Sequence, residues 1–219
     1  NTLCRGWNMT NVISADSNAK KHYKHSGFSR IITDSYTSPS WYPKGITWDG
    51  DNVISADSNA KKHYKHSGFS STITDSYTSP YTHPTGITWD GDNVISADDY
   101  EYKHYKHSGF SSTITDSYTL PFMSPAPKGI TWDGDNVISA DAIAKKHYKH
   151  SGFSSTITDS YSSPYSYPTG ITWDGRYAAP PPPPETSERS LDSDQSYGNE
   201  IYIDYGSYGN EIYIKTINA

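Results

Sequence analysis

The sequence is short of the residues that build helical and disulfide-bonded proteins. It has only the leucines Leu3, Leu120 and Leu191 and two methionines, against 20 tyrosines. Ile, Thr, Tyr and Ser therefore outweigh the helix formers, which predicts an all-β protein with almost no helix. The single cysteine, Cys4, cannot form a disulfide within the chain. It is either a small buried residue or the partner of a cysteine in another molecule.

A basic surplus and long apolar runs are also missing. Lys and Arg total 18 against 24 Asp and Glu, the net charge is −6, and the lysines recur within repeats without forming a block. We therefore expect no nucleic-acid partner. No apolar run approaches the roughly 18 residues of a membrane-spanning helix, so we expect no membrane insertion.

The first residues bear on location. The chain begins with Asn1 and not Met, which is typical of a processed product, and Asn8-Met9-Thr10 is its one glycosylation sequon. With a composition rich in Tyr, Ser, Thr and Pro, these features predict an extracellular or cell-surface location with Asn8 glycosylated. A sequon this short also arises by chance, so an unmodified Asn8 stays the alternative.

What is present is a repeat. The hexapeptide NVISAD begins at Asn11, Asn52, Asn93 and Asn136, with spacings of 41, 41 and 43 residues. A tryptophan keeps the same phase at Trp7, Trp48, Trp89, Trp132 and Trp173. A fifth copy starts with residues 170–175 and then breaks off. Periods in this range are typical of repeat architectures.

Each repeat contains four strand-like runs. In the second copy they are residues 45–49, 52–56, 62–67 and 72–78, separated by turn residues such as Asp49-Gly50. Four antiparallel strands in about 41 residues are typical of a β-propeller blade. The sequence therefore predicts propeller repeats over residues 1–175: blades at about 2–40, 44–80, 85–125 and 128–168, and the start of a fifth at 169–175.

One motif carries a family resemblance. The segment from Pro84 through Asn93 to Asp98 reads PTGITWDGDNVISAD and resembles the blade signature of NHL-like and SMP-30-like β-propellers. The resemblance covers about residues 2–175. It implies the fold but not an activity, because this superfamily has binding, scaffolding and enzymatic members. Those families usually build six blades, and they commonly have aliphatic residues where this chain has His63 and Lys65.

The C-terminal part leaves the repeat. Residues 176–195 form a Pro-rich and polar linker, in which Pro180–Pro184 favour polyproline II. Two SYGNEIYI copies then predict a β-hairpin tail over 196–219. This tail either completes a fifth blade or pairs with a neighbouring subunit by strand addition. Its expected assembly residues are Ile201, Tyr202, Ile203, Ile212, Tyr213 and Ile214.

Histidines and aspartates are the candidate metal ligands. His63 and His66 recur as His22/His25, His104/His107 and His147/His150. Residues three apart on a strand point to opposite faces, so we expect these histidines to pack between blades or lie at the wet outer edge. A metal would need histidines from several blades to converge. The Asp-Gly-Asp-Asn loops at 49–52, 90–93 and 133–136 resemble calcium loops, but hairpin chemistry explains them. We expect no metal and no cofactor.

The places where the copies differ indicate a binding face. The links into each blade and the turns between the second and third strands vary, and both loop sets should emerge on the same face of a propeller. Exposed aromatic loops are suited to partners or sugars, although these aromatics could also simply cover blade edges. The candidate binding residues are Trp41, Tyr42, Tyr81, His83, Phe122, Tyr165 and Tyr167.

The sequence has no nucleophile or phosphate-loop motif. We therefore expect a non-enzymatic, extracellular structural or adhesive propeller that forms a homo-oligomer or polymer, such as a filament joined through the C-terminal tail. The alternatives are a lectin-like module that binds glycans through its aromatic loops, and a propeller enzyme.

Overall fold

The repeats form strands because each run is rich in β-branched and aromatic residues and ends at Gly, Asp, Asn or Pro. The computed structural model describes residues 11–121 and 126–173. Its strands are β1 Val12–Asp16, β2 Lys21–His25, β3 Ile32–Thr37, β4 Pro43–Trp48, β5 Val53–Asp57, β6 Lys62–His66, β7 Ile73–Thr78, β8 Pro84–Trp89, β9 Val94–Asp98, β10 Lys103–His107, β11 Ile114–Thr119, β12 Pro127–Trp132, β13 Val137–Asp141, β14 Lys146–His150 and β15 Ile157–Ser162. Within these ranges there is no helix, and hence none long and apolar enough to cross a membrane.

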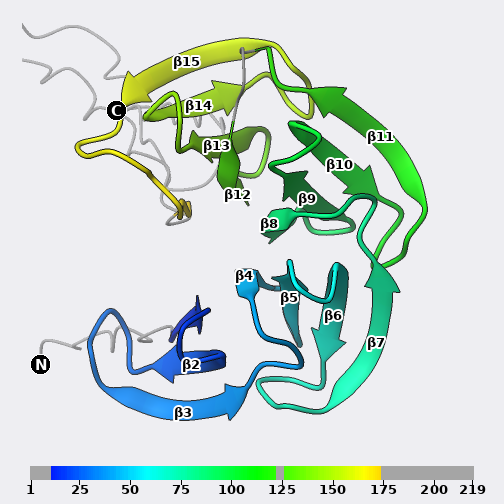
Figure 1. Ribbon diagram of the computed structural model, residues 1–219, viewed down its shortest axis with the longest axis vertical. Coiled ribbons are helices and arrows are strands. Elements are labelled where there is room, and N and C mark those ends of the chain that lie inside the picture. The colour runs from blue at the N-terminus through cyan, green and yellow to red at the C-terminus, as the bar shows by residue number, and fades with distance from the viewer. Residues whose placement is uncertain (1–10, 122–125, 174–219) are drawn as a thin grey trace, which may run out of the picture. The chain divides into compact units, whose positions relative to one another are not determined.

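The strands pair in chain order into antiparallel sheets, which we call blades 1 to 4 (Figure 1). Blade 1 is β1–β3, blade 2 is β4–β7, blade 3 is β8–β11 and blade 4 is β12–β15. The predicted all-β propeller of repeated blades is confirmed. Blade 1 has three strands instead of the expected four among the described residues, because the chain before Asn11 lies outside them.

The hairpin at each Asp-Gly pair forms as the sequence predicts. Gly50 has a φ of 110°, a conformation that a residue with a Cβ rarely adopts. The Asp49 amide donates to the Asn52 carbonyl at 3.1 Å and closes the turn. The corresponding glycines, Gly91 and Gly134, have φ values of 110° and 106°. The first hairpins of blades 2, 3 and 4 therefore form by the same local chemistry.

The hydrophobic core lies between successive blades. Figure 1 shows the blades following one another in an arc, with β4, β8 and β12 toward its centre and β3, β7, β11 and β15 outside. Ile54 of blade 2 packs with Ile87 and Val94 of blade 3, and Ile95 of blade 3 packs with Ile130 and Val137 of blade 4. Each blade thus depends on its neighbours to bury its apolar residues.

The chain divides into two compact units, Asn1–Arg176 and Tyr177–Ala219. The second unit lies outside the described residues, as do Asn8, Cys4 and Phe122. The predicted linker over 176–195, the hairpin over 196–219 and the six assembly residues of the tail therefore stay predictions.

Candidate functional site

A buried aspartate at the end of the NVISAD segment fixes the two variable loops in each of blades 2, 3 and 4. In blade 2, Asp57 is 1% exposed. Its Oδ1 accepts from the Ala60 amide in the turn at 2.8 Å, and its Oδ2 accepts from the Tyr42 amide in the link at 3.1 Å. Asp98 and Asp141 make the equivalent pairs of bonds in blades 3 and 4. Both loop sets therefore lie at the same end of the blade, as the strand order predicts.

The aromatic residues of these loops are largely exposed. The exposed fractions are 62% for Trp41, 51% for Tyr42, 82% for Tyr165 and 71% for Tyr167. The Trp41 ring is not open on both sides, because Lys20 Nζ from the preceding blade lies 3.1 Å from its centroid. Tyr165 and Tyr167 are therefore the most accessible of the predicted residues that the structure describes.

Tyr81 and His83 form a separate cluster with the neighbouring turn. Tyr81 stacks on Tyr100 with centroids 5.6 Å apart, and His83 meets the same ring edge-on at 5.6 Å. His83 Nδ1 also lies 3.7 Å from Asp99 Oδ1. Among the described residues, ring contacts join the links into blades 2 and 3 to a nearby turn, and they do not gather the predicted residues into a single pocket. The sequence predicted the loops but could not show how their rings pair.

The first turn of blades 2, 3 and 4 uses its carboxylate for hairpin and ion-pair contacts. Asp49 Oδ1 accepts from the Asn52 amide at 2.7 Å, and Asp49 Oδ2 lies 2.7 Å from Lys65 Nζ. Burial alone would raise the pKa of Asp49, but the bond from Lys65 and the backbone amides hold it below its usual range. Asp90 with Lys106 and Asp133 with Lys149 repeat the pair at 2.8 and 2.9 Å. Hairpin chemistry explains these loops without calcium.

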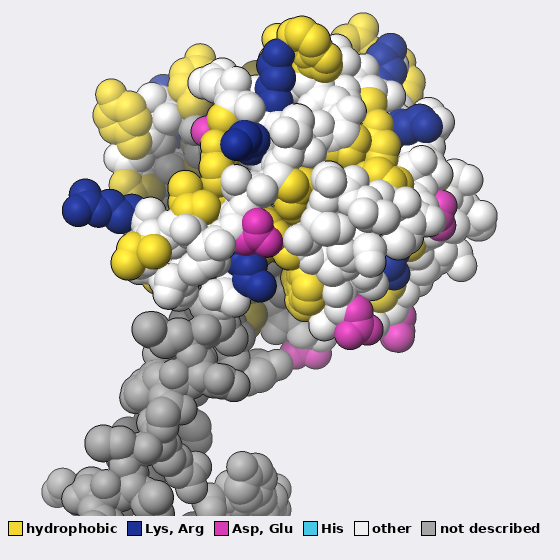
Figure 2. All heavy atoms as spheres, turned by 90° about the horizontal axis from the view of Figure 1, so that it is seen from below, with side chains coloured by type: hydrophobic (Ala, Val, Ile, Leu, Met, Phe, Trp, Pro, Cys, Tyr) yellow, Lys and Arg dark blue, Asp and Glu magenta, His cyan; other side chains and the backbone are white. Residues whose placement is uncertain are grey.

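The histidines of β6 and β10, with His22 and His150, lie between blades, which is one of the two placements that the sequence left open. His63 contacts His107 of the next blade, whereas His66 contacts His22 of the preceding blade, each at 5.5 Å between ring centroids. The two members of the pair therefore face opposite sides of blade 2. The face in Figure 2 shows none of the described histidines. Within residues 11–121 and 126–173, no three His, Cys, Asp or Glu side chains cluster as a metal site would require.

Hydrogen bonds define the tautomer of the second histidine in the pairs of blades 2, 3 and 4. His66 Nδ1 lies 2.9 Å from the Ser70 carbonyl, which only accepts, so Nδ1 carries the proton. Nε2 then accepts from the Ser55 hydroxyl at 3.1 Å. Burial lowers the pKa of His66 to about 4, although the bond to Ser70 opposes this shift. These rings are neutral structural groups and not general bases poised near neutral pH.

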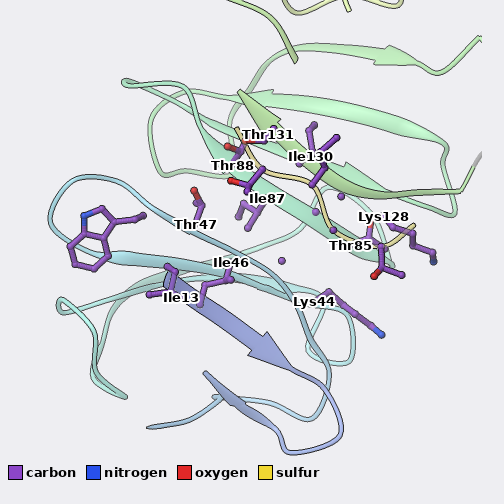
Figure 3. Close-up of a pocket in the computed structure, with 18 of the residues that line it drawn as sticks. Ile13, Lys44, Ile46, Thr47, Thr85, Ile87, Thr88, Lys128, Ile130 and Thr131 are labelled. Atoms are coloured by element: carbon purple, nitrogen blue, oxygen red, sulfur yellow. The ribbon is translucent and has the colours of Figure 1, made fainter. Parts of the chain in front are cut away.

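The central cavity is lined by the innermost segments of copies two to five, which are parts of β4, β8 and β12 and residues 169–172, together with residues 11–13 of the first copy (Figure 3). Its volume is about 680 Å³. Ile46, Ile87 and Ile130 lie along it, with Thr47, Thr88 and Thr131 toward one end and Lys44 and Lys128 toward the other. Lys128 Nζ pairs with Asp99. The described lining has no carboxylate or histidine, so it offers hydroxyl and ammonium donors but no acid–base pair.

A contact that the sequence pattern did not reveal holds the innermost segments together. A Cβ on Gly86 would lie 2.9 Å from the Lys128 carbonyl oxygen, and one on Gly45 would lie 2.7 Å from the Ile87 nitrogen. Real Cβ atoms essentially never come this close. A signal was present, because copies two to five all carry glycine here (Gly45, Gly86, Gly129 and Gly170), whereas the first copy has Cys4 at the corresponding position.

These features define the class of protein, a β-propeller. Among solved structures, the chain is similar to Myxococcus xanthus glutaminyl cyclase, with a TM-score of 0.60, 9% identity, and 73% of this chain and 75% of that chain covered. It is also similar to a catalytically inactive virginiamycin B lyase from Staphylococcus aureus, solved with quinupristin. The TM-score is 0.54 and the identity 22%, with 77% of this chain and 58% of that chain covered. A third similar structure is the computationally designed Ika8 protein, with a TM-score of 0.51, 9% identity, and 74% of this chain and 49% of that chain covered.

These likenesses concern the fold alone, because all three identities are below 25%. No protein-family model matches the chain, so membership of the NHL-like or SMP-30-like family is not confirmed. No curated protein matches it either. The enzymatic and designed neighbours do not decide whether this chain is an enzyme.

Proposed function

We propose that this chain is a non-enzymatic structural or adhesive propeller of the extracellular space, which holds partners through its variable aromatic loops. The observation that carries the proposal is the contrast between two sets of polar and aromatic groups. The histidines and aspartates of the repeat are engaged in packing, turns and ion pairs, whereas Trp41, Tyr42, Tyr165 and Tyr167 are 51 to 82% exposed. Exposed aromatics on a rigid scaffold suit adhesion.

A lectin-like role is the second candidate, and the open rings of Tyr165 and Tyr167 favour it. Sugars stack on exposed aromatic faces, and these two residues are 82% and 71% exposed. Trp41 suits a sugar less well because Lys20 covers one face.

The test compares bead adhesion for the full chain and two double variants, Trp41→Ala/Tyr42→Ala and Tyr165→Ala/Tyr167→Ala. Beads coated with each protein are washed over hydrophobic, protein-coated and glycan-coated surfaces. We expect retention to fall about tenfold or more in one double variant, since a few aromatic anchors carry most binding energy. Ile73→Ser, at a 37% exposed position on β7, serves as the control. Retention restricted to glycans would favour the lectin role, and retention unchanged in both double variants would rule out the loops.

A further inference from the structure

Successive blades meet through one interface that recurs three times. We call the side of a blade that faces the next blade its trailing face, and the side that faces the previous blade its leading face. Between blades 2 and 3, His63 and Tyr77 of the trailing face contact His107 and Phe110 of the leading face. The same pairs recur between blades 1 and 2 as His22–His66 and Tyr36–Phe69, and between blades 3 and 4 as His104–His150 and Tyr118–Phe153.

The leading face of blade 1 has the residues for this interface, but no blade lies against it within the part of the chain that the structure describes. Phe28, which corresponds to Phe69, is fully exposed. Val12 is 38% exposed, whereas the corresponding valines of the other blades, Val53, Val94 and Val137, are 0% exposed. This face is therefore one side of the interface found between successive blades, and its partner side is missing among the described residues.

The trailing face of blade 4 is the opposite side of the same interface, and it too lacks a partner blade among the described residues. Tyr161 is 60% exposed. Beside it lies a cavity of about 380 Å³, lined in part by Ile138, Tyr161, Ile171 and Trp173. By the repeat spacing, Ile138, Ile171 and Trp173 correspond to Ile95, Ile130 and Trp132, which enclose Val137 and Phe153 in the cluster between blades 3 and 4.

The cavity therefore has counterparts of Ile95, Ile130 and Trp132 in its wall. Its lining has no counterpart of the valine and the phenylalanine that complete the cluster between blades 3 and 4. The rest of the chain cannot supply them, because residues 174–219 contain no Val, no Phe and no His. The chain's own blade 1 lies at the opposite end of the arc from blade 4 (Figure 1). Blade 1 of a second copy carries one residue of each of these three types, namely Val12, Phe28 and His25.

We propose that the trailing face of blade 4 binds the leading face of blade 1 of a second copy. Val12 and Phe28 of that copy fill the cavity, and its His25 packs against His147 and Tyr161. The contact joins two different surfaces, so a dimer keeps one free face of each kind and further copies add head to tail. This interface is separate from the aromatic loops, and either proposal can fail without the other.

Two full-length variants test this arrangement, Phe28→Asp on blade 1 and Tyr161→Asp on blade 4. Sedimentation velocity and light scattering over a range of concentrations should show wild-type association that either substitution weakens by about 30-fold or more, as at an interface hot spot. An equimolar mixture of the two variants should form a dimer and nothing larger. Each variant retains one intact face, and the mixture can form only one contact.

Ile73→Asp, at a 37% exposed position on β7 of blade 2, is the control and should associate like the wild type. Thermal unfolding followed by circular dichroism shows whether each variant folds. Phe28→Ser and Tyr161→Ser replace any aspartate variant that melts early. A wild type that stays monomeric at all concentrations would overturn the proposal, because the tail or blade 1 of the same chain would then cover the face. Association that neither variant weakens, or a mixture without dimer, would also overturn it.

Discussion

At the scale of single residues, the tightest constraint lies on the glycines that line the central cavity. Gly86 packs against the backbone of the next repeat, with the Lys128 oxygen 2.9 Å from where a Cβ would lie. Gly170 occupies the same position in the fifth copy, yet a Cβ added there would have no described heavy atom within 4 Å. The same residue in the same motif therefore differs in its surroundings only because of its place in the array.

Gly86→Ala should lower the free energy of unfolding by about 1–3 kcal/mol, because the methyl group overpacks against backbone that cannot move freely. Gly170→Ala is the matched control and should leave stability within about 0.5 kcal/mol of the wild type. Urea unfolding at low protein concentration measures both. Equal stabilities for the two variants would contradict the close packing of the innermost segments.

At the scale of the element, each blade interface buries neutral histidines. His63 is 0% exposed, and neither of its ring nitrogens has a hydrogen-bond partner in the structure. Burial, with a smaller contribution from His107, lowers the pKa of His63 to about 3. Burial likewise lowers the pKa of His107 and of His150 to about 4. Protonation of these rings opposes folding, because the folded state cannot hydrate the charge.

This arrangement predicts acid unfolding. The folded state binds these protons only near pH 3 to 4, whereas the unfolded state binds them from about pH 6.5 downward. Stability is therefore complete above about pH 6.5 and falls as the pH drops toward 4, by up to about 1.4 kcal/mol per pH unit for each such histidine. Urea titrations at several pH values measure this slope.

His63→Leu removes one of these protonation sites without removing a hydrogen bond. The free energy of unfolding should then fall less steeply with falling pH, by up to about 1.4 kcal/mol per pH unit. Ile73→Ser, at a 37% exposed position on β7, removes no titratable group; it is the control and should keep the wild-type slope. A stability that does not change between pH 7 and 5 would contradict the neutral, buried state of these rings.

At the scale of the whole molecule, identical strands have different surroundings. The pentapeptide VISAD forms β1, β5, β9 and β13. Every residue of it is buried in β5 and β9, but in β1 the first and last are exposed and the others are half-buried. A repeat array stabilises its members through neighbours, so the terminal blade is the least protected.

Amide hydrogen exchange should therefore be faster in β1 than in β5 or β9, although the sequence is the same and intrinsic exchange rates cancel in the comparison. Mass spectrometry at low protein concentration measures this difference. Protection in β1 should rise at concentrations where copies associate. Equal protection at every concentration would show that something already covers blade 1.

The fold was largely predictable from the sequence, and the candidate site was not. Strand period, the Asp-Gly turns and the 41-residue spacing are local signals, so the strands of blade 2 fall within two residues of their predicted bounds. The aromatic loops could be named, but the stacking of Tyr81 on Tyr100 and of Lys20 on Trp41 joins segments far apart in the chain. Such pairing depends on where the side chains lie in space, which cannot be read from a single sequence.

The sequence by itself determined the blade, because turn chemistry, alternation and repeat length act within some 40 residues. It also determined that His63 and His66 face opposite sides, since side chains alternate along a strand. Only the tertiary structure decided which copies of the interface are filled. Burial depends on what stands beside a blade, so Phe69 is covered and the identical Phe28 is fully exposed.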